Sequence, residues 1–196
     1  MSKEDELFEI ADHQQGYFTT AQAKECGYYD SHFRRYLSRG EWIKINRGLY
    51  RLSRYPVSDR PDLIEWSLWS RNKQGEIQGV FSHETALDLY ELCDIMPAKL
   101  HLTVPCHFRK SISIPSVLKL YYANLEAKDW VEQQGYRITT PIKTFLDLAI
   151  TRQLSDDLLK QAVIEARKRG ILSKHLIESL PNTAAGNFLR KLYNEK

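Results

Sequence analysis

The hydrophobic pattern of the chain changes its period at Gly40, and this change limits the possible fold more than any other sequence feature. Before Gly40, apolar residues recur at the spacing of amphipathic helices, and a glycine directly follows each predicted helix. After Gly40, two short β-prone runs flank Asn46-Arg47-Gly48, where glycine allows the positive φ of a tight hairpin. The predicted helices cover residues 4–15, 21–26 and 30–39. Three helices followed by a β-hairpin are typical of a winged helix-turn-helix.

A segment rich in turn residues separates this unit from the rest of the chain. Residues 53–61 contain two prolines and two serines and show no apolar periodicity, as expected for a linker. We therefore predict a winged helix-turn-helix domain over residues 1–54, a linker over residues 55–61 and a C-terminal domain over residues 62–196.

The predicted C-terminal domain mixes helical and strand patterns. Helical spacing of apolar residues predicts helices at residues 62–72, 82–92, 144–150, 155–169 and 182–196. Alternation of apolar and polar residues predicts strands at residues 99–105, 116–122 and 136–139. The predicted fold class is therefore α+β, with an N-terminal winged helix-turn-helix followed by a larger mixed α/β domain.

The charge of the chain is concentrated on the predicted third helix and the hairpin. The whole chain has a net charge of only +3, which alone does not indicate a nucleic-acid partner. Residues 1–27 have a net charge of −4, residues 28–54 of +5, and the remaining residues of +2. The near-neutral total hides a basic segment in the two elements that a winged helix presents to DNA.

The predicted third helix has an apolar face and a basic face. We expect the apolar face to pack against the first two helices; it consists of Tyr29, Phe33, Tyr36 and Leu37. Arginine suits the basic face because its planar guanidinium forms paired hydrogen bonds with guanine or phosphate. A merely solvated charged face is the alternative, but the cations of the hairpin favour double-stranded DNA. The predicted DNA-binding residues are Ser31, His32, Arg34, Arg35, Ser38, Arg39, Lys44 and Arg47.

Polar side chains in the second half of the chain have structural explanations. Ser82, His83 and Glu84 are adjacent, but neighbouring residues on a helix point about 100° apart. We interpret Ser82 as a helix N-cap and Glu84 as an acid in the first turn. Asp147 lies in an apolar helix and needs a basic or backbone partner. We predict no catalytic residues.

The sequence likewise predicts no metal site and no cofactor. His101, Cys106 and His107 do not have the spacing of a common zinc site. The chain has three cysteines, an odd number without a CxxC pair, which favours free and mostly buried thiols.

Two other function classes remain open. The first is a winged-helix regulator whose C-terminal domain senses a small ligand. The second is a metal-dependent nuclease, for which Glu126, Asp129 and Glu132 are the clustered acids, although no lysine on a strand accompanies them.

The sequence predicts a cytoplasmic protein without a membrane partner. No stretch approaches the roughly 18–20 consecutive apolar residues of a membrane helix. The acidic N-terminus has no apolar signal core behind it.

Several motifs, taken in their order along the chain, resemble the AbiEi family of type IV toxin–antitoxin systems. The N-terminal ones are Gly-Tyr-Phe-Thr-Thr-Ala-Gln-Ala at residues 16–23 and Arg-Gly-Glu-Trp-Ile-Lys-Ile-Asn-Arg-Gly-Leu-Tyr at residues 39–50. The later ones are Val-Phe-Ser-His-Glu-Thr-Ala-Leu at residues 80–87, His-Leu-Thr-Val-Pro at residues 101–105 and Ile-Thr-Thr-Pro-Ile-Lys-Thr-Phe-Leu-Asp-Leu at residues 138–148.

The resemblance covers about residues 5–170 and implies two functions. It implies an N-terminal domain that binds inverted repeats in the promoter of its own operon and represses transcription. It also implies a C-terminal domain that counteracts a nucleotidyltransferase-like toxin, without a stable complex between the two proteins.

Overall fold

The computed structural model describes residues 2–195, which form two compact units. The first unit consists of Met1–Gln78 and Glu132–Tyr136, and the second of Gly79–Val131 and Arg137–Lys196. The two units are described separately below.

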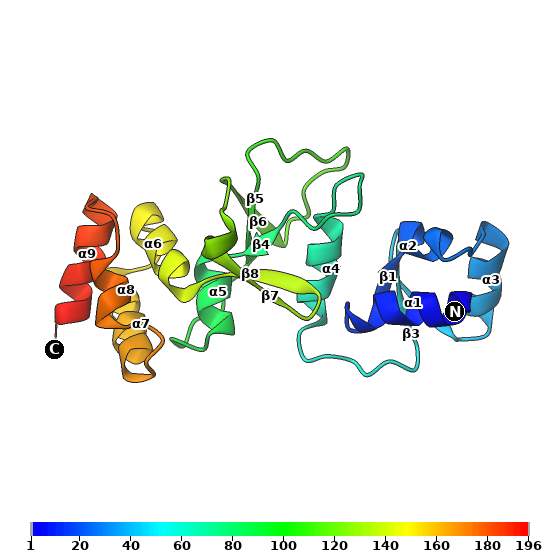
Figure 1. Cartoon of the computed structure of the whole chain (residues 1–196), viewed down its shortest axis with the longest axis horizontal. Helices are drawn as coiled ribbons and strands as arrows, with labels where there is room; N and C mark the ends of the chain where they lie inside the picture. The colour runs from blue at the N-terminus through cyan, green and yellow to red at the C-terminus, as the bar shows by residue number, and fades with distance from the viewer. Residues whose placement is uncertain (1, 196) are drawn as a thin grey trace. The chain divides into compact units, whose positions relative to one another are not determined.

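The first unit begins with three helices and a small antiparallel sheet (Figure 1). Its elements are α1 (Lys3–Asp12), β1 (Tyr17–Thr19), α2 (Thr20–Glu25), α3 (Asp30–Ser38), β2 (Trp42–Asn46) and β3 (Leu49–Leu52). The strand order is β1-β3-β2. The three predicted helices and the hairpin are therefore confirmed, while β1 was not predicted because its pairing with β3 is long-range.

Buried aromatic rings hold α3 against the sheet. The Tyr36 ring on α3 stacks on the Trp42 ring of β2, with centroids 4.7 Å apart and planes 19° apart. Trp42 also contacts the Phe18 ring edge-on at 4.8 Å and the Phe33 ring at 5.2 Å. Offset and edge-on pairs such as these add stabilisation beyond the burial of their area, so the orientation of α3 is well determined.

Helix α4 (Pro61–Trp69) belongs to the first unit. Ile64 and Leu68 on this helix are buried together with Tyr17 of β1 and Leu49 of β3. The compact unit therefore continues through the predicted linker and includes α4. The predicted start of the C-terminal domain at residue 62 does not coincide with the end of this compact unit. Periodicity identified the helix correctly but could not show which apolar face it covers. A functional division at residues 55–61 stays a prediction.

The second unit contains most of a five-stranded mixed sheet. Its strand order is β6-β5-β4-β8-β7, in which β4 pairs antiparallel with β5 and parallel with β8, and β5 pairs parallel with β6. The strands are β4 (Val80–Phe81), β5 (Leu100–Val104), β6 (Leu118–Tyr122), β7 (Trp130–Gln133) and β8 (Tyr136–Thr139), with a short 3-10 turn η1 (Ala127–Asp129) before β7. The predicted strands correspond to β5, β6 and β8, whereas β4 and β7 were not predicted.

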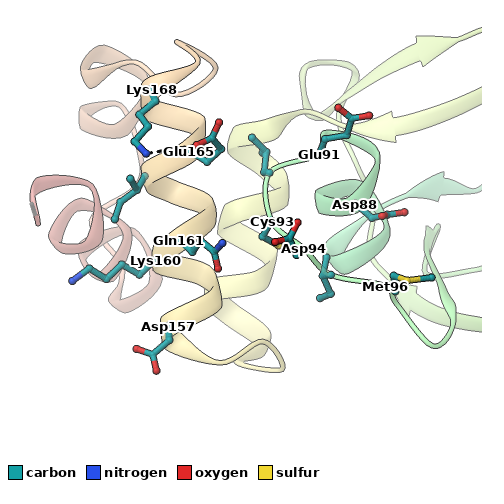
Figure 2. A pocket seen from close by; sticks show the side chains of 13 residues that line it. Asp88, Glu91, Cys93, Asp94, Met96, Asp157, Lys160, Gln161, Glu165 and Lys168 are labelled. Atoms are coloured by element: carbon teal, nitrogen blue, oxygen red, sulfur yellow. Dashed lines mark ion pairs between the residues drawn. The ribbon is translucent and has the colours of Figure 1, made fainter.

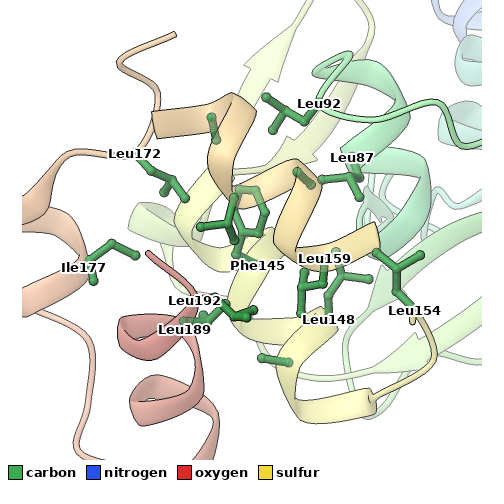
Figure 3. Packing of buried hydrophobic residues seen from close by; sticks show 14 of the residues in the cluster. Leu87, Leu92, Phe145, Leu148, Leu154, Leu159, Leu172, Ile177, Leu189 and Leu192 are labelled. Atoms are coloured by element: carbon green, nitrogen blue, oxygen red, sulfur yellow. The ribbon is translucent and has the colours of Figure 1, made fainter. Parts of the chain in front are cut away.

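Helices form the main apolar core of the second unit (Figure 3). They are α5 (His83–Leu89), α6 (Pro141–Thr151), α7 (Asp156–Lys168), α8 (Lys174–Glu178) and α9 (Ala184–Asn194). Phe145 and Leu148 of α6 are fully buried beside Leu159 of α7 and Leu189 of α9. Ser155 caps α7, whose first turn is acidic and whose last turn is basic, as the helix dipole favours. The chain therefore has the predicted α+β fold class.

Candidate nucleic-acid interface

Helix α3 has a buried face and an exposed face. Phe33 and Tyr36 are buried, as predicted. Tyr29 was expected on the same face, but it is the N-cap residue and is 71% exposed. Its backbone is extended, with φ −101° and ψ 166°, so helical spacing does not apply to it. The preceding residue, Tyr28, is buried in its place.

The exposed face of α3 carries the predicted DNA-binding side chains. Most of these residues are exposed; they are Ser31, Arg34, Arg35, Ser38 and the C-cap residue Arg39. The Ser38 hydroxyl donates a hydrogen bond to the backbone carbonyl of Arg35 at 2.9 Å. The Arg39 guanidinium lies 3.8 Å from the Glu41 carboxylate at an exposed position, where such a pair contributes little stability. These arginines therefore remain accessible to a polyanion.

His32 is half-buried and has a structural contact of its own. Its Nδ1 accepts a hydrogen bond of 2.9 Å from the backbone N–H of Tyr29, which caps the start of α3. Desolvation lowers the pKa of His32, and the neighbouring cations Lys3 and Arg35 lower it further. The neutral ring that these effects favour is the form that can accept this hydrogen bond.

The β2–β3 hairpin carries the two remaining predicted residues. Lys44 and Arg47 are exposed, and Gly48 has φ +75° at the turn, as the hairpin prediction required. An irregularity between Lys44 and Asn46 interrupts the regular pairing of β2 with β3, so side chains do not simply alternate between the two faces there. Asn46 stabilises the turn, because its Oδ1 accepts from the Arg47 N–H at 2.7 Å and its Nδ2 donates to Glu65 at 3.0 Å.

Not every charge in the basic segment is available to a ligand. Arg51 is buried, and its guanidinium donates a hydrogen bond of 2.7 Å to the backbone carbonyl of Tyr55. The sequence count of residues 28–54 therefore overstates the exposed positive charge. The arginines and the lysine predicted to contact DNA are all exposed.

The second unit contains a hydrogen-bonded polar cluster whose geometry the sequence did not show. Ser82 is the N-cap residue of α5, but its hydroxyl does not cap the helix. Its Oγ lies 2.9 Å from His83 Nδ1 and accepts a hydrogen bond of 2.7 Å from the Thr103 hydroxyl. His83 has φ +52°, an unusual value outside glycine, and its ring stacks on the Tyr121 ring at 3.6 Å. Adjacency of Ser82 and His83 was visible in the sequence, whereas Thr103 and Tyr121 come from distant strands.

Burial keeps the histidines of this cluster neutral. Desolvation, aided by His101 and two lysines, lowers the pKa of His83 to about 3. Desolvation and Lys119 lower the pKa of His101 to about 4. The Nε2 atom of His101 lies 4.0 Å from the Glu84 carboxylate. Glu84 therefore lies close to a residue that is distant in the sequence, in addition to being in the first turn of α5.

Asp147 has the basic partner that was predicted for it. The Lys143 ammonium, one turn earlier on α6, pairs with the Asp147 carboxylate. Burial raises the pKa of Asp147, and Lys143 opposes that rise. This pair therefore provides the compensation that a buried acid requires.

The other candidate side chains have separate local contacts. Asp129 accepts a hydrogen bond from the Glu126 N–H at 2.9 Å, and Glu126 pairs with Lys128 at 2.7 Å, so these acids stabilise η1. Among residues 2–195, no three His, Cys, Asp or Glu side chains gather in a position suited to a metal ion. The cysteines differ in burial: Cys26 is buried, Cys93 is half-buried, and Cys106 is exposed, contrary to the expectation of mostly buried thiols.

A pocket of about 880 Å³ opens between α7 and the segment that follows α5 (Figure 2). Acidic side chains predominate around it, with Asp88, Glu91 and Asp94 on one side and Asp157 and Glu165 on α7. Its volume falls in the range of small-molecule sites, which are about 300–1,000 Å³. Nothing in the sequence pattern marked this pocket, because its walls come from segments about 70 residues apart.

Three helices, a small antiparallel sheet and an exposed basic helix place the first unit in the winged helix-turn-helix class. Residues 5–53 match the model of a family described as "Transcriptional regulator, AbiEi antitoxin". This N-terminal segment is therefore similar to AbiEi-type regulator domains, in agreement with the resemblance of its motifs.

The whole chain is similar in structure to the RV2827C protein from Mycobacterium tuberculosis. The TM-score is 0.54 at 15% sequence identity, and the match covers 100% of this chain and 78% of that chain. At this identity the likeness concerns the fold alone. No curated protein matches the sequence significantly. Within residues 2–195, no helix combines the length and apolar character needed to cross a membrane.

Proposed function

We propose that the chain is a DNA-binding antitoxin and autorepressor of a type IV toxin–antitoxin operon. The observation that carries the proposal is the exposed set of cations on α3 and the β2–β3 hairpin, in a segment that matches the AbiEi regulator family. The DNA partner is then an inverted repeat in the promoter of the operon. The toxin is nucleotidyltransferase-like and is opposed without a stable complex. The protein acts in the cytoplasm and has no enzymatic activity.

The DNA part of the proposal is tested with the DNA upstream of the chain's own reading frame. Gel shift and footprinting should show a protected inverted repeat, and a reporter fused to this promoter should be repressed. An Arg34/Arg35/Arg39 triple alanine variant should be strongly weakened in both effects and keep only residual binding at low salt, because these guanidinium groups are exposed on the proposed recognition helix. Unchanged binding by this variant would refute the assignment of α3.

A single substitution distinguishes base contacts from phosphate contacts. If Arg35 reads a base, Arg35→Ala should weaken binding to the cognate site by about 1–3 kcal/mol and leave non-specific binding nearly unchanged. An equal loss on every sequence would instead identify Arg35 as a phosphate contact.

The antitoxin part is tested by co-expression with the neighbouring nucleotidyltransferase-like reading frame. The chain should restore growth, and the triple alanine variant should still restore it if repression and neutralisation use different surfaces. Failure of the wild-type chain to restore growth would refute the antitoxin role and leave the DNA-binding role standing.

A regulator with a ligand-sensing second unit is the second candidate, favoured by the pocket between α7 and the segment after α5. Under this function a small molecule bound there changes the affinity for the operator. A substitution that fills the pocket would then alter repression in cells without affecting DNA binding by the purified protein.

A further inference from the structure

Tyr29 is a large aromatic residue that the fold leaves in solvent at the start of α3. It is 71% exposed, whereas the preceding residue Tyr28 is only 1% exposed. The backbone of Tyr29 is extended, and successive side chains of an extended segment point to opposite sides. Because Tyr28 points into the core, Tyr29 points away from it.

Contacts with His32 restrain the exposed ring of Tyr29. The backbone N–H of Tyr29 donates a hydrogen bond of 2.9 Å to His32 Nδ1. The centres of the two rings lie 5.7 Å apart, and their planes are tilted by 38°. A side chain that is already restrained loses less conformational entropy when a partner covers it than a freely rotating one does. The Tyr29 ring is therefore partly organised for contact before any partner binds.

The charges around Tyr29 allow a polyanion to approach it. Asp30 is the one acidic residue in the α3 segment, and its carboxylate lies 3.0 Å from the Lys24 ammonium of α2. A pair this exposed contributes little stability, but it balances the negative charge next to Tyr29. Ser31 and Arg34 are exposed in the following turn. A DNA backbone therefore meets no unbalanced carboxylate at the start of α3.

The chemistry of the major groove indicates what an exposed ring at this position can contact. Recognition helices of helix-turn-helix domains contact base edges through their N-terminal residues. The C5-methyl of thymine is the apolar group that base pairs present in the major groove, and apolar side chains contact it. Phe33 and Tyr36 of α3 are buried, so Tyr29 is the large apolar side chain available at this end of the helix. Arginine reads guanine through hydrogen bonds and does not replace this contact.

We propose that Tyr29 contacts the methyl group of a thymine in the operator and makes the protein specific for thymine at that position. The inference rests on the proposed DNA-binding function and adds a specificity-determining residue to its basic side chains. Burial of one methyl group against the ring predicts an affinity about fourfold higher for thymine than for the same base without its methyl.

Replacement of thymine by deoxyuridine tests the contact, because it removes only the methyl group and keeps the base pairing. Each thymine of the protected repeat is replaced in turn, and the affinity of the full chain is measured by fluorescence anisotropy. Replacement at one position of the repeat should weaken wild-type binding about fourfold. Tyr29→Ala should bind the thymine and deoxyuridine operators equally. Tyr29→Phe, which keeps the ring, should retain the fourfold difference.

A matched control and the possible outcomes keep the inference separate from the proposed function. Tyr122→Ala removes an exposed tyrosine of the second unit and should keep the wild-type difference. Operator binding that is insensitive to every replacement, or a Tyr29→Ala variant that keeps the wild-type difference, would overturn the proposal and leave the DNA-binding function standing. Weaker binding of Tyr29→Phe to all DNA without any methyl dependence would identify a phosphate contact of the hydroxyl and would also overturn it. Failure of the wild-type chain to bind the operator would refute both.

Discussion

The salt dependence of DNA binding provides a quantitative test of the proposed interface. The first unit exposes five cations on α3 and the hairpin, namely Arg34, Arg35, Arg39, Lys44 and Arg47. If each neutralises one phosphate, the logarithm of the association constant should fall with the logarithm of salt concentration with a slope of about −4.5. Raising monovalent salt fourfold should then weaken binding about 500-fold.

The triple alanine variant makes this prediction specific to α3. Two of the five cations remain, so the slope should decrease in size to about −1.8, and the same change of salt should weaken binding only about 12-fold. Fluorescence anisotropy at several salt concentrations measures both slopes. Lys73→Ala, at an exposed position outside α3 and the hairpin, is the control and should keep the wild-type slope. A wild-type slope in the triple variant would refute the claim that these arginines contact phosphates.

Three further predictions concern stability, and urea unfolding measures each. Gly16→Ala should destabilise the protein by at least about 1 kcal/mol more than Gly27→Ala. At φ +88° the alanine Cβ at position 16 would lie 2.5 Å from the Tyr55 side chain, whereas the space at position 27 is open. Equal losses of stability in the two variants would contradict this prediction. Lys143→Met should cost about 3 kcal/mol by leaving Asp147 buried without its cation, and adding Asp147→Leu should recover most of the loss. The pKa of His83 is about 3 in the folded state and about 6.5 when unfolded, so the unfolded state binds more protons in between and stability should fall as pH falls through this range. His83→Gln should reduce this slope, and an unchanged slope would exclude His83 as its source.

The exposed face of α3 could be predicted because helical spacing alone determines it. Arg34, Arg35 and Ser38 lie within one helix, and the buried positions Phe33 and Tyr36 fix the opposite side. The prediction was wrong at Tyr29, where the helix has not yet begun. The spacing of apolar residues therefore predicts the buried face inside a helix but not at the N-cap residue, where the helix has not begun.

Long-range pairing accounts for the features that the sequence did not show. Strand β1 is three residues long and exists because Tyr17, Phe18 and Thr19 pair with β3, about 30 residues further along the chain. Helix α4 has a clear apolar face, but periodicity does not reveal that this face covers Tyr17 and Leu49. Likewise, the Ser82 hydroxyl accepts a hydrogen bond from Thr103 on β5 and does not cap α5, although the sequence predicted that it would.

The distribution of charge in the first unit explains why the net charge of the chain is a poor guide to its partner. Asp5 accepts from the Ser2 N–H at 3.0 Å in a capping box, and its position at the helix N-terminus is favourable for a carboxylate. Glu4 binds the Tyr36 hydroxyl, and Arg51 serves a backbone carbonyl from a buried position. These charged groups form hydrogen bonds within the fold, so the charge available on the surface differs from the net charge of the sequence. The cations that remain are concentrated on α3 and the hairpin, and DNA affinity should therefore follow the exposed charge of these two elements rather than the total of +3.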